Sequence, residues 1–86
     1  MTRSIAIVRI FAESAYMDSV VNALSRLDNM EEYFEVTGES DIVAFVSADD
    51  SEDLRNILKT KIMSIKGVKG TLSSVVRKDM NLAVDG

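Results

Sequence analysis

The sequence predicts an α+β sandwich of the order βαββαβ, in which two helices cover one face of a four-stranded antiparallel sheet. Four apolar segments rich in β-branched residues alternate with two amphipathic segments in that order. A shift of 37 residues lays one half of the chain on the other, Ile5 on Ile42 and Val20 on Ile57, as expected of two tandem βαβ units. A turn at Gly38 falls between the two middle strands, where the fold needs a hairpin. Together these features predict a ferredoxin-like fold.

The first part of the chain is expected to form a strand and then a helix. Six of the seven residues from Ile5 to Phe11 are apolar, which predicts a strand at Ser4–Phe11. The helix runs from Glu13 or Ser14 to about Leu27, after which the apolar pattern stops. Its apolar stripe recurs at steps of three and four residues and consists of Met17, Val20, Val21, Leu24 and Leu27.

The two middle strands are expected to form a hairpin. The second strand is predicted at Met30–Thr37, and its three glutamates place it near an edge of the sheet. The third strand is predicted at Asp41–Ala48, whose strongly apolar character is typical of a central strand. Gly38, Glu39 and Ser40 form the turn, in which glycine supplies a positive φ.

The second half of the chain repeats the pattern of helix and strand. Asp49, Asp50 and Ser51 are N-cap candidates, and Glu52 three residues after Asp49 resembles a capping box. A stripe follows at Leu54, Ile57, Leu58, Ile62 and Ile65. Gly67 stands where a C′ glycine would end the helix, before a fourth strand at Val68–Arg77. We therefore divide the chain into a domain at 1–78 and a C-terminal tail at 79–86, in which Leu82–Val84 has the pattern of a short strand.

The central strands are apolar on both of their sides. In the first strand Ile5 and Ile7 project to one side while Val8 and Ile10 project to the other, and the third strand has the same character. A sheet with one solvated face should alternate apolar and polar residues instead. The face without helices therefore needs a cover, because an exposed apolar patch of that size promotes aggregation. We expect a sheet-to-sheet homodimer. The sequence leaves open which residues face the helices.

The residue types that are missing exclude several kinds of chemistry. The chain has no Cys and no His, so thiolate or imidazole metal ligands, cysteine nucleophiles and the usual base near neutral pH are absent. We therefore expect no metal site, no cofactor and no enzymatic activity. An acylphosphatase-like hydrolase is the enzyme alternative on this fold, and it needs an arginine-bearing, glycine-rich phosphate loop after the first strand. Here that connection reads Phe11–Ala15, which is acidic and lacks glycine.

The charge balance and hydropathy bear on partners and location. Ten basic and 14 acidic residues give a net charge of −4, which argues against direct nucleic-acid binding. The apolar runs are too short to span a membrane, and the apolar N-terminal segment alternates into charged positions, unlike a signal peptide. We therefore expect a cytoplasmic protein that binds neither nucleic acid nor membrane directly.

Two polar segments are candidate binding sites. The residues around Gly38 and Asp41 are interpretable either as a plain hairpin turn or as a small-molecule pocket. In the pocket interpretation, turn amides bind a carboxylate and Asp41 accepts from an ammonium group. Thr37, Glu39 and Ser40 lie in the same loop. The second segment is a polar cluster on the fourth strand that is either an exposed strand face or part of the site, and it consists of Thr71, Ser73 and Ser74.

The chain resembles a known family at these same residues. The run from Tyr33 to Val46 is similar to the central Gly-x-x-Asp hairpin of the Lrp/AsnC (feast/famine) regulators, here Gly38 and Asp41. The later Ile65-Lys66-Gly67-Val68 followed by Thr71 is similar to the second half of their effector domain, the RAM (regulation of amino-acid metabolism) domain. The resemblance covers about residues 4–77. No helix-turn-helix precedes the first strand, so the chain resembles the stand-alone RAM proteins.

The resemblance implies a regulator without catalytic activity. Such domains pair into dimers that assemble into octameric or decameric rings, and amino acids bind between dimers at the Gly-x-x-Asp loop. The implied contacts are Thr37, Gly38, Glu39, Ser40 and Asp41, with Thr71, Ser73 and Ser74 from the fourth strand. The implied partners are an amino-acid effector and full-length Lrp/AsnC regulators. The alternative is a purely structural oligomerisation module that binds no ligand.

Overall fold

The computed structural model describes residues 4–36 and 41–76, and these residues form the predicted ferredoxin-like sandwich. The sheet has the strand order β2-β3-β1-β4 with every pair antiparallel, so the first and third strands are central as expected. The elements of the described part are β1 (Ser4–Ala12), the 3-10 turn η1 (Ser14–Tyr16), α1 (Met17–Leu24), β2 (Met30–Val36), β3 (Asp41–Ala48), α2 (Ser51–Ile57), the π-helical turn η2 (Leu58–Ile62) and β4 (Val68–Val76).

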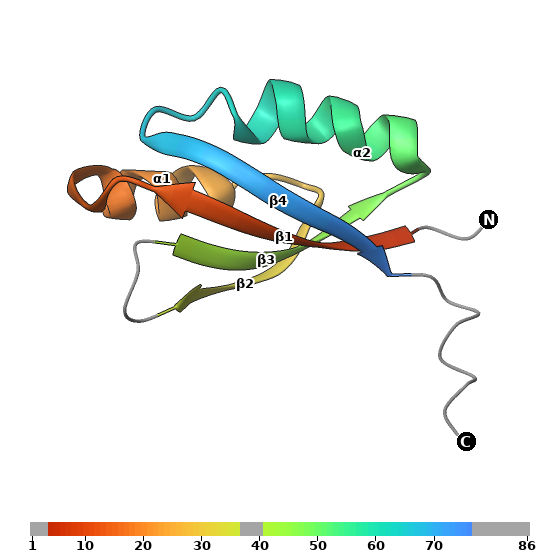
Figure 1. Ribbon diagram of the computed structural model, residues 1–86, viewed down its shortest axis with the longest axis horizontal. Coiled ribbons are helices and arrows are strands. Elements are labelled where there is room, and N and C mark those ends of the chain that lie inside the picture. The colour runs from red at the N-terminus through yellow and green to blue at the C-terminus, as the bar shows by residue number, and fades with distance from the viewer. Residues whose placement is uncertain (1–3, 37–40, 77–86) are drawn as a thin grey trace, which may run out of the picture.

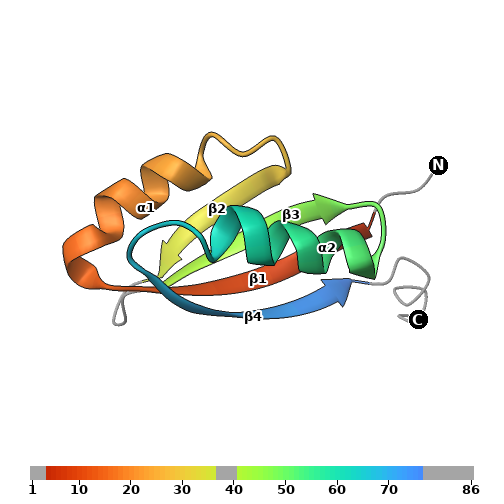
Figure 2. The ribbon, with the colours of Figure 1, turned by 90° about the horizontal axis from the view of Figure 1, so that it is seen from above.

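Both helices lie on the same face of the sheet (Figures 1 and 2). The even-numbered residues of the central strands point toward them and are buried. Five helical residues complete this core, each at most 5% exposed: Val20 and Leu24 of α1, Leu54 and Ile57 of α2, and Ile62 of η2. The strand residues of the core are Ala6, Val8, Ile10, Ala12, Ile42, Ala44, Val46 and Ala48.

The structure corrects the internal repeat. A shift of 37 residues lays Ile5 on Ile42, yet Ile42 belongs to the core while Ile5 points to the other face. Because the side-chain period of a strand is two residues, an odd shift exchanges the faces. Both faces of these strands are apolar, so hydropathy alone does not determine which residue of the first half corresponds to which residue of the second half.

The start of α2 differs from the predicted capping box by one residue. Asp50 is the N-cap, and its side chain accepts a hydrogen bond of 2.8 Å from the backbone N–H of Asp53. The Asp53 side chain in turn accepts from the backbone N–H of Asp49 at 2.9 Å. Glu52 therefore takes no part in the reciprocal pair. Four carboxylates stand within five residues at the start of α2, so the sequence does not distinguish these registers, since each carboxylate can accept from a free N–H group.

Both helices end earlier than predicted. α1 stops at Leu24 because the N–H groups of Arg26 and Leu27 bond to carbonyls three residues back, which tightens the chain into turns. After α2 the helix widens, with the Met63 N–H bonding to Leu58 five residues earlier. The Thr60 hydroxyl bonds to the carbonyl of Asn56 in this segment, a contact that often bends helices.

Gly67 is not the C′ residue of the helix but the last residue of the turn before β4. Its φ is +101°, a backbone conformation that residues with a side chain rarely adopt. A Cβ atom at Gly67 would collide with the Cβ of Tyr16. The glycine is therefore required both by the backbone and by the close approach of η1.

β2 is an edge strand, as its charge predicted. Its outer side is unpaired within the described residues, and Glu31, Glu32 and Glu35 are all exposed. The pairing of β2 with β3 shifts register between Met30 and Glu32.

Several predictions fall outside the described residues. They are the turn at 38–40, the last residue of the second and of the fourth predicted strands, the boundary at 78, and the strand pattern at 82–84. Within the described ranges, no helix has the length and hydropathy needed to cross a membrane.

Candidate functional site

The sheet face opposite the helices is apolar, as the sequence predicted, and several of its side chains are exposed in the isolated chain. Ile7 of β1, Phe34 of β2 and Leu72 of β4 are 37%, 52% and 65% exposed. Cross-strand partners share a face, and the register places these three side chains on one surface with Val43 and Phe45 of β3. Phe34 and Phe45 pack edge to face, with ring centroids 6.3 Å apart. We call this surface the open face.

One charged pair lies on the open face, where β3 begins. Asp41 is the partner of Phe11 across the sheet, so its side chain points away from the helices. Arg9 donates from Nε to Asp41 Oδ2 at 2.8 Å. The Asp41 side chain is fully buried, whereas that of Arg9 remains 48% exposed. The Arg9 guanidinium also lies over the Phe11 ring, 5.7 Å from its centroid.

The second oxygen of Asp41 has no partner. Oδ1 is buried and accepts no hydrogen bond within the described part of the chain. A buried polar atom without a partner costs about 1–3 kcal/mol, more when the group is charged. Buried carboxylate oxygens are therefore normally satisfied, and an exception calls for a donor outside the described residues.

The sequence identified Asp41 as a candidate residue and missed Arg9. The signal for Arg9 was present, because it is the one charged residue within an otherwise apolar run from Ile5 to Phe11. A charge at a central-strand position needs a partner. The other predicted hairpin residues, Thr37, Gly38, Glu39 and Ser40, lie outside the described residues.

The predicted polar cluster on β4 is divided between the two faces of the sheet. Ser74 pairs with Ile7 and faces the open side, whereas Thr71 and Ser73 pair with Ile10 and Val8 and face the helices. Neighbouring residues of a strand point to opposite sides, so the three hydroxyls do not form one cluster. Ser73 lines a hollow of about 190 Å³ between α2 and β4, with Ser51, Leu54, Arg55 and Leu58.

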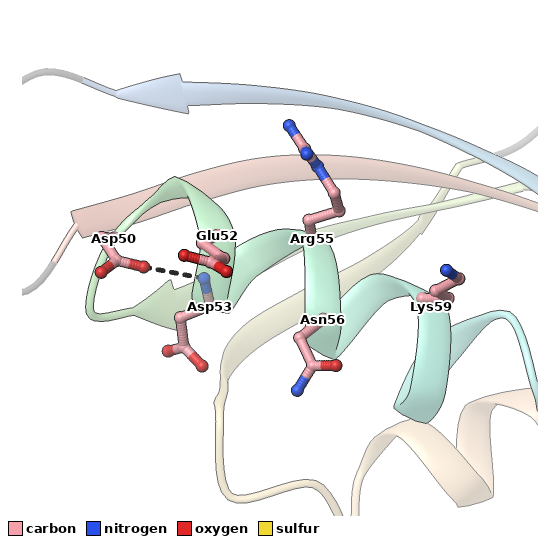
Figure 3. A pocket seen from close by; sticks show the side chains of 6 residues that line it. All are labelled: Asp50, Glu52, Asp53, Arg55, Asn56 and Lys59. Carbon is pink, nitrogen blue, oxygen red and sulfur yellow. Dashed lines mark hydrogen bonds between the residues drawn. The ribbon is translucent and has the colours of Figure 1, made fainter.

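Another hollow lies on α2 and η2, away from the open face. It has a volume of about 460 Å³, and its charged side chains point outward from the helix (Figure 3). Asp50 and Asp53 are engaged in capping α2. The lining residues are Asp50, Glu52, Asp53, Arg55, Asn56 and Lys59. Among the described residues no group of three His, Cys, Asp or Glu side chains is arranged to hold a metal ion.

Comparison with known proteins identifies the family. A family model described as the Lrp/AsnC ligand binding domain matches residues 5–81. The chain belongs to this family. The match includes the hairpin that carries Asp41 and the whole of the sheet, so the resemblance predicted from the sequence is confirmed.

The similar proteins include both regulators and enzymes. Escherichia coli AsnC has 26% sequence identity and a TM-score of 0.78, with 85% of this chain and 50% of AsnC covered. TTHA0845 from Thermus thermophilus has 28% identity and a TM-score of 0.79, with 87% and 94% covered. A homocitrate synthase of Saccharolobus islandicus is 39% identical over 67 residues, or 78% of this chain. The chain spans only 14% of the length of that enzyme.

Proposed function

We propose that this Lrp/AsnC domain is a non-catalytic sensor that binds an amino acid at Asp41 and acts through its state of assembly. The observation that carries the proposal is the buried Asp41 Oδ1, which lacks a hydrogen-bond donor among the described residues. The ammonium group of an amino acid supplies such a donor together with a charge opposite to that of the carboxylate. The match to a ligand-binding domain family supports the same role.

The remaining residues of the proposed site come from two segments. Thr37, Gly38, Glu39 and Ser40 directly precede Asp41 in the chain, and in our proposal they add backbone amides and side chains to the site. Of the β4 residues, Ser74 shares the open face with Asp41, whereas Thr71 and Ser73 point to the helix side. In our proposal Thr71 and Ser73 contact the ligand of a neighbouring subunit rather than that of their own chain.

The proposed assembly begins with a homodimer through the open face. Its support is the exposure of Ile7, Phe34 and Leu72 on one surface, which a second copy of the same face would bury. The Asp41 end of β3 then lies at the margin of the dimer interface, where further dimers meet in an octameric or decameric ring. Ligand binding at such a shared site stabilises the larger assembly by mass action. Full-length Lrp/AsnC regulators are the proposed partners for mixed assembly.

Calorimetry with the twenty amino acids tests the ligand proposal. Asp41→Asn keeps the shape of the side chain and removes its charge, so we expect affinity for the bound amino acid to fall about ten- to hundredfold. Asp28→Asn, an exposed carboxylate between α1 and β2, is the matched control and should leave affinity unchanged. Binding that survives Asp41→Asn would place the site elsewhere. If no amino acid binds the wild type, the structural-module alternative replaces this proposal.

A second candidate function is the control of an enzyme rather than of transcription. It is favoured by sequence identity, which is 39% to a segment of homocitrate synthase against 26% to AsnC. In this alternative the ligand-bound chain acts on an enzyme of the homocitrate synthase class. The test adds the purified chain to such an enzyme from the same organism, with and without the bound amino acid. A change in turnover that Asp41→Asn abolishes supports enzyme control, and an unchanged rate contradicts it.

A further inference from the structure

Arg9 is a cation on the apolar open face, where its ion-pair partner is Asp41. Its cross-strand neighbours are Val43 and Leu72, and neither carries a charge. Two contacts hold the guanidinium at the Asp41 end of the face, the 2.8 Å hydrogen bond to Asp41 and the stacking on Phe11. Nearly half of the side chain nevertheless remains accessible. In the isolated chain Arg9 is therefore fixed in orientation and accessible, at the Asp41 end of the open face that the proposed dimer leaves at its margin.

The contact with Asp41 uses only part of the guanidinium. The donor is Nε, which carries one of the five N–H groups. The four N–H groups on the two Nη atoms make no hydrogen bond within residues 4–36 and 41–76. These two nitrogens form the end-on fork that binds carboxylates through two parallel hydrogen bonds. The pairing with Asp41 thus orients the fork without occupying it.

The pair leaves two unused and opposite functions side by side. Oδ1 of Asp41 is a buried acceptor without a partner among the described residues, and the Nη atoms of Arg9 are donors without one. Because the formal charges of the two side chains cancel, a ligand with a net charge would leave one charge uncompensated in a partly buried place. The complement of an acceptor beside a donor fork is a molecule that carries an ammonium beside a carboxylate.

We infer that Arg9 is a specificity-determining residue that binds the ligand carboxylate, so that Arg9 and Asp41 together select zwitterionic α-amino acids over amines. The inference rests on the proposed function, because it places the ligand ammonium at Asp41 Oδ1. Arg9 is outside the hairpin and outside the β4 hydroxyls, and it extends the site onto β1. If Arg9 only neutralised Asp41, its replacement would alter stability without altering the choice between an amino acid and an amine.

Removal of Arg9 should reverse the charge preference of the site. Arg9→Met keeps a long apolar side chain over Phe11 and deletes the fork, which leaves Asp41 as a lone anion. The site then lacks a partner for the carboxylate and gains attraction for a cation. Arg9→Lys retains the charge but presents a single ammonium in place of the fork, so it should restore the preference only in part.

The experiment compares each amino acid with its decarboxylated amine by calorimetry. The probe pairs are leucine with isoamylamine, phenylalanine with phenethylamine and lysine with cadaverine. Wild type should favour the amino acid of the bound pair by about ten- to hundredfold, the effect expected for one charged hydrogen-bonding contact. Arg9→Met should reduce that ratio to about one or below, and Arg9→Lys should give an intermediate ratio.

The controls separate the two levels of the proposal. Arg55→Met removes an exposed arginine on α2, on the helix side of the sheet, and should leave the ratio at the wild-type value. If the ratio of amino-acid affinity to amine affinity is the same for wild type and Arg9→Met, the role of Arg9 is wrong while the proposed function stands. Absence of amino-acid binding to wild type contradicts the proposed function itself. Circular dichroism verifies the fold of each variant, and if Arg9→Met does not fold, Arg9→Lys decides.

Discussion

From Ile5 to Ala12 both faces of β1 present apolar side chains, with Arg9 as the exception on the open face, but the two faces differ in what covers them. Val8 and Ile10 face the helices and are 0% exposed, whereas Ile7 on the opposite side of the strand is 37% exposed. The helix side is filled by Leu24, Ile57 and their neighbours. The open side ends in the charged pair of Arg9 and Asp41. Apolar character alone thus does not distinguish a surface that stabilises the fold from one that is available for association.

The largest expected effect comes from placing a charge in the helix-covered core. Val46 is 1% exposed and belongs to the core between β3 and the helices. Val46→Asp buries an unpaired carboxylate there, so we expect destabilisation of more than about 4 kcal/mol, enough to unfold a small domain. Urea denaturation followed by circular dichroism measures the loss. A cooperatively folded variant with nearly native stability would contradict the assignment of this face to the core.

The same change on the open face should act on association instead. Ile7 projects away from the helices, so Ile7→Asp places its carboxylate in solvent in the isolated chain. We expect the fold to persist and the proposed dimer to dissociate, because the interface would otherwise bury an unpaired charge. Sedimentation velocity at micromolar concentration measures the outcome. A wild-type chain that is already monomeric under these conditions would contradict the dimer.

A matched pair of leucine truncations gives a finer comparison of the two faces. Leu24 is fully buried on the helix side, and Leu24→Ala should cost about 2–5 kcal/mol of unfolding free energy. Leu72 is 65% exposed on the open side, and Leu72→Ala should change the stability of the monomer by less than about 0.5 kcal/mol. Leu72→Ala should instead weaken self-association. Equal effects of both variants on the monomer would show that the faces are not distinct.

The smallest effect concerns the helix side alone. Asp50→Ala removes the side chain that caps α2, and we expect a loss of about 0.5–2 kcal/mol in stability without a change in self-association. Glu52→Ala, which removes the neighbouring carboxylate of the first turn, is the control and should cost less. Thermal unfolding of both variants measures the difference. A larger loss for Glu52→Ala would restore the capping box that the sequence suggested.

The sequence was sufficient for the order of the elements and for the existence of two apolar faces. Alternation between β-branched runs and amphipathic stripes located β1 and β3 within one residue, and the glutamates of β2 placed it at an edge. The assignment of faces could not be predicted, because Ile7 and Val8 are equally apolar and only the packed helices distinguish them. The choice among adjacent carboxylates at the start of α2 was undetermined for a similar reason.

The candidate site was predictable only in part. Asp41 follows from its position after a glycine turn, a local pattern of the sequence. Arg9 lies 32 positions away from Asp41, and their contact depends on the pairing of β1 with β3. The β4 hydroxyls are adjacent in sequence yet lie on opposite faces. The polar residues chosen from the sequence therefore included hydroxyls that lie on opposite faces of the sheet, and they omitted Arg9, which strand pairing places beside Asp41.

The outer edge of β2 is poorly suited to pairing with the same edge of a second copy. A second β2 placed antiparallel beside this edge would bring three exposed glutamates, Glu32 on the open face, Glu35 on the helix side and Glu31 at the register shift, near those of an equally acidic strand. The register shift after Met30 also interrupts the straight ladder that an added strand requires. Growth by pairing one β2 edge with another, the route that leads to ribbons and fibres, is thus opposed by both charge and geometry. Two copies that pack through their open faces instead bury both of these faces in one contact. Such a symmetric association stops at the dimer and does not continue into a fibre.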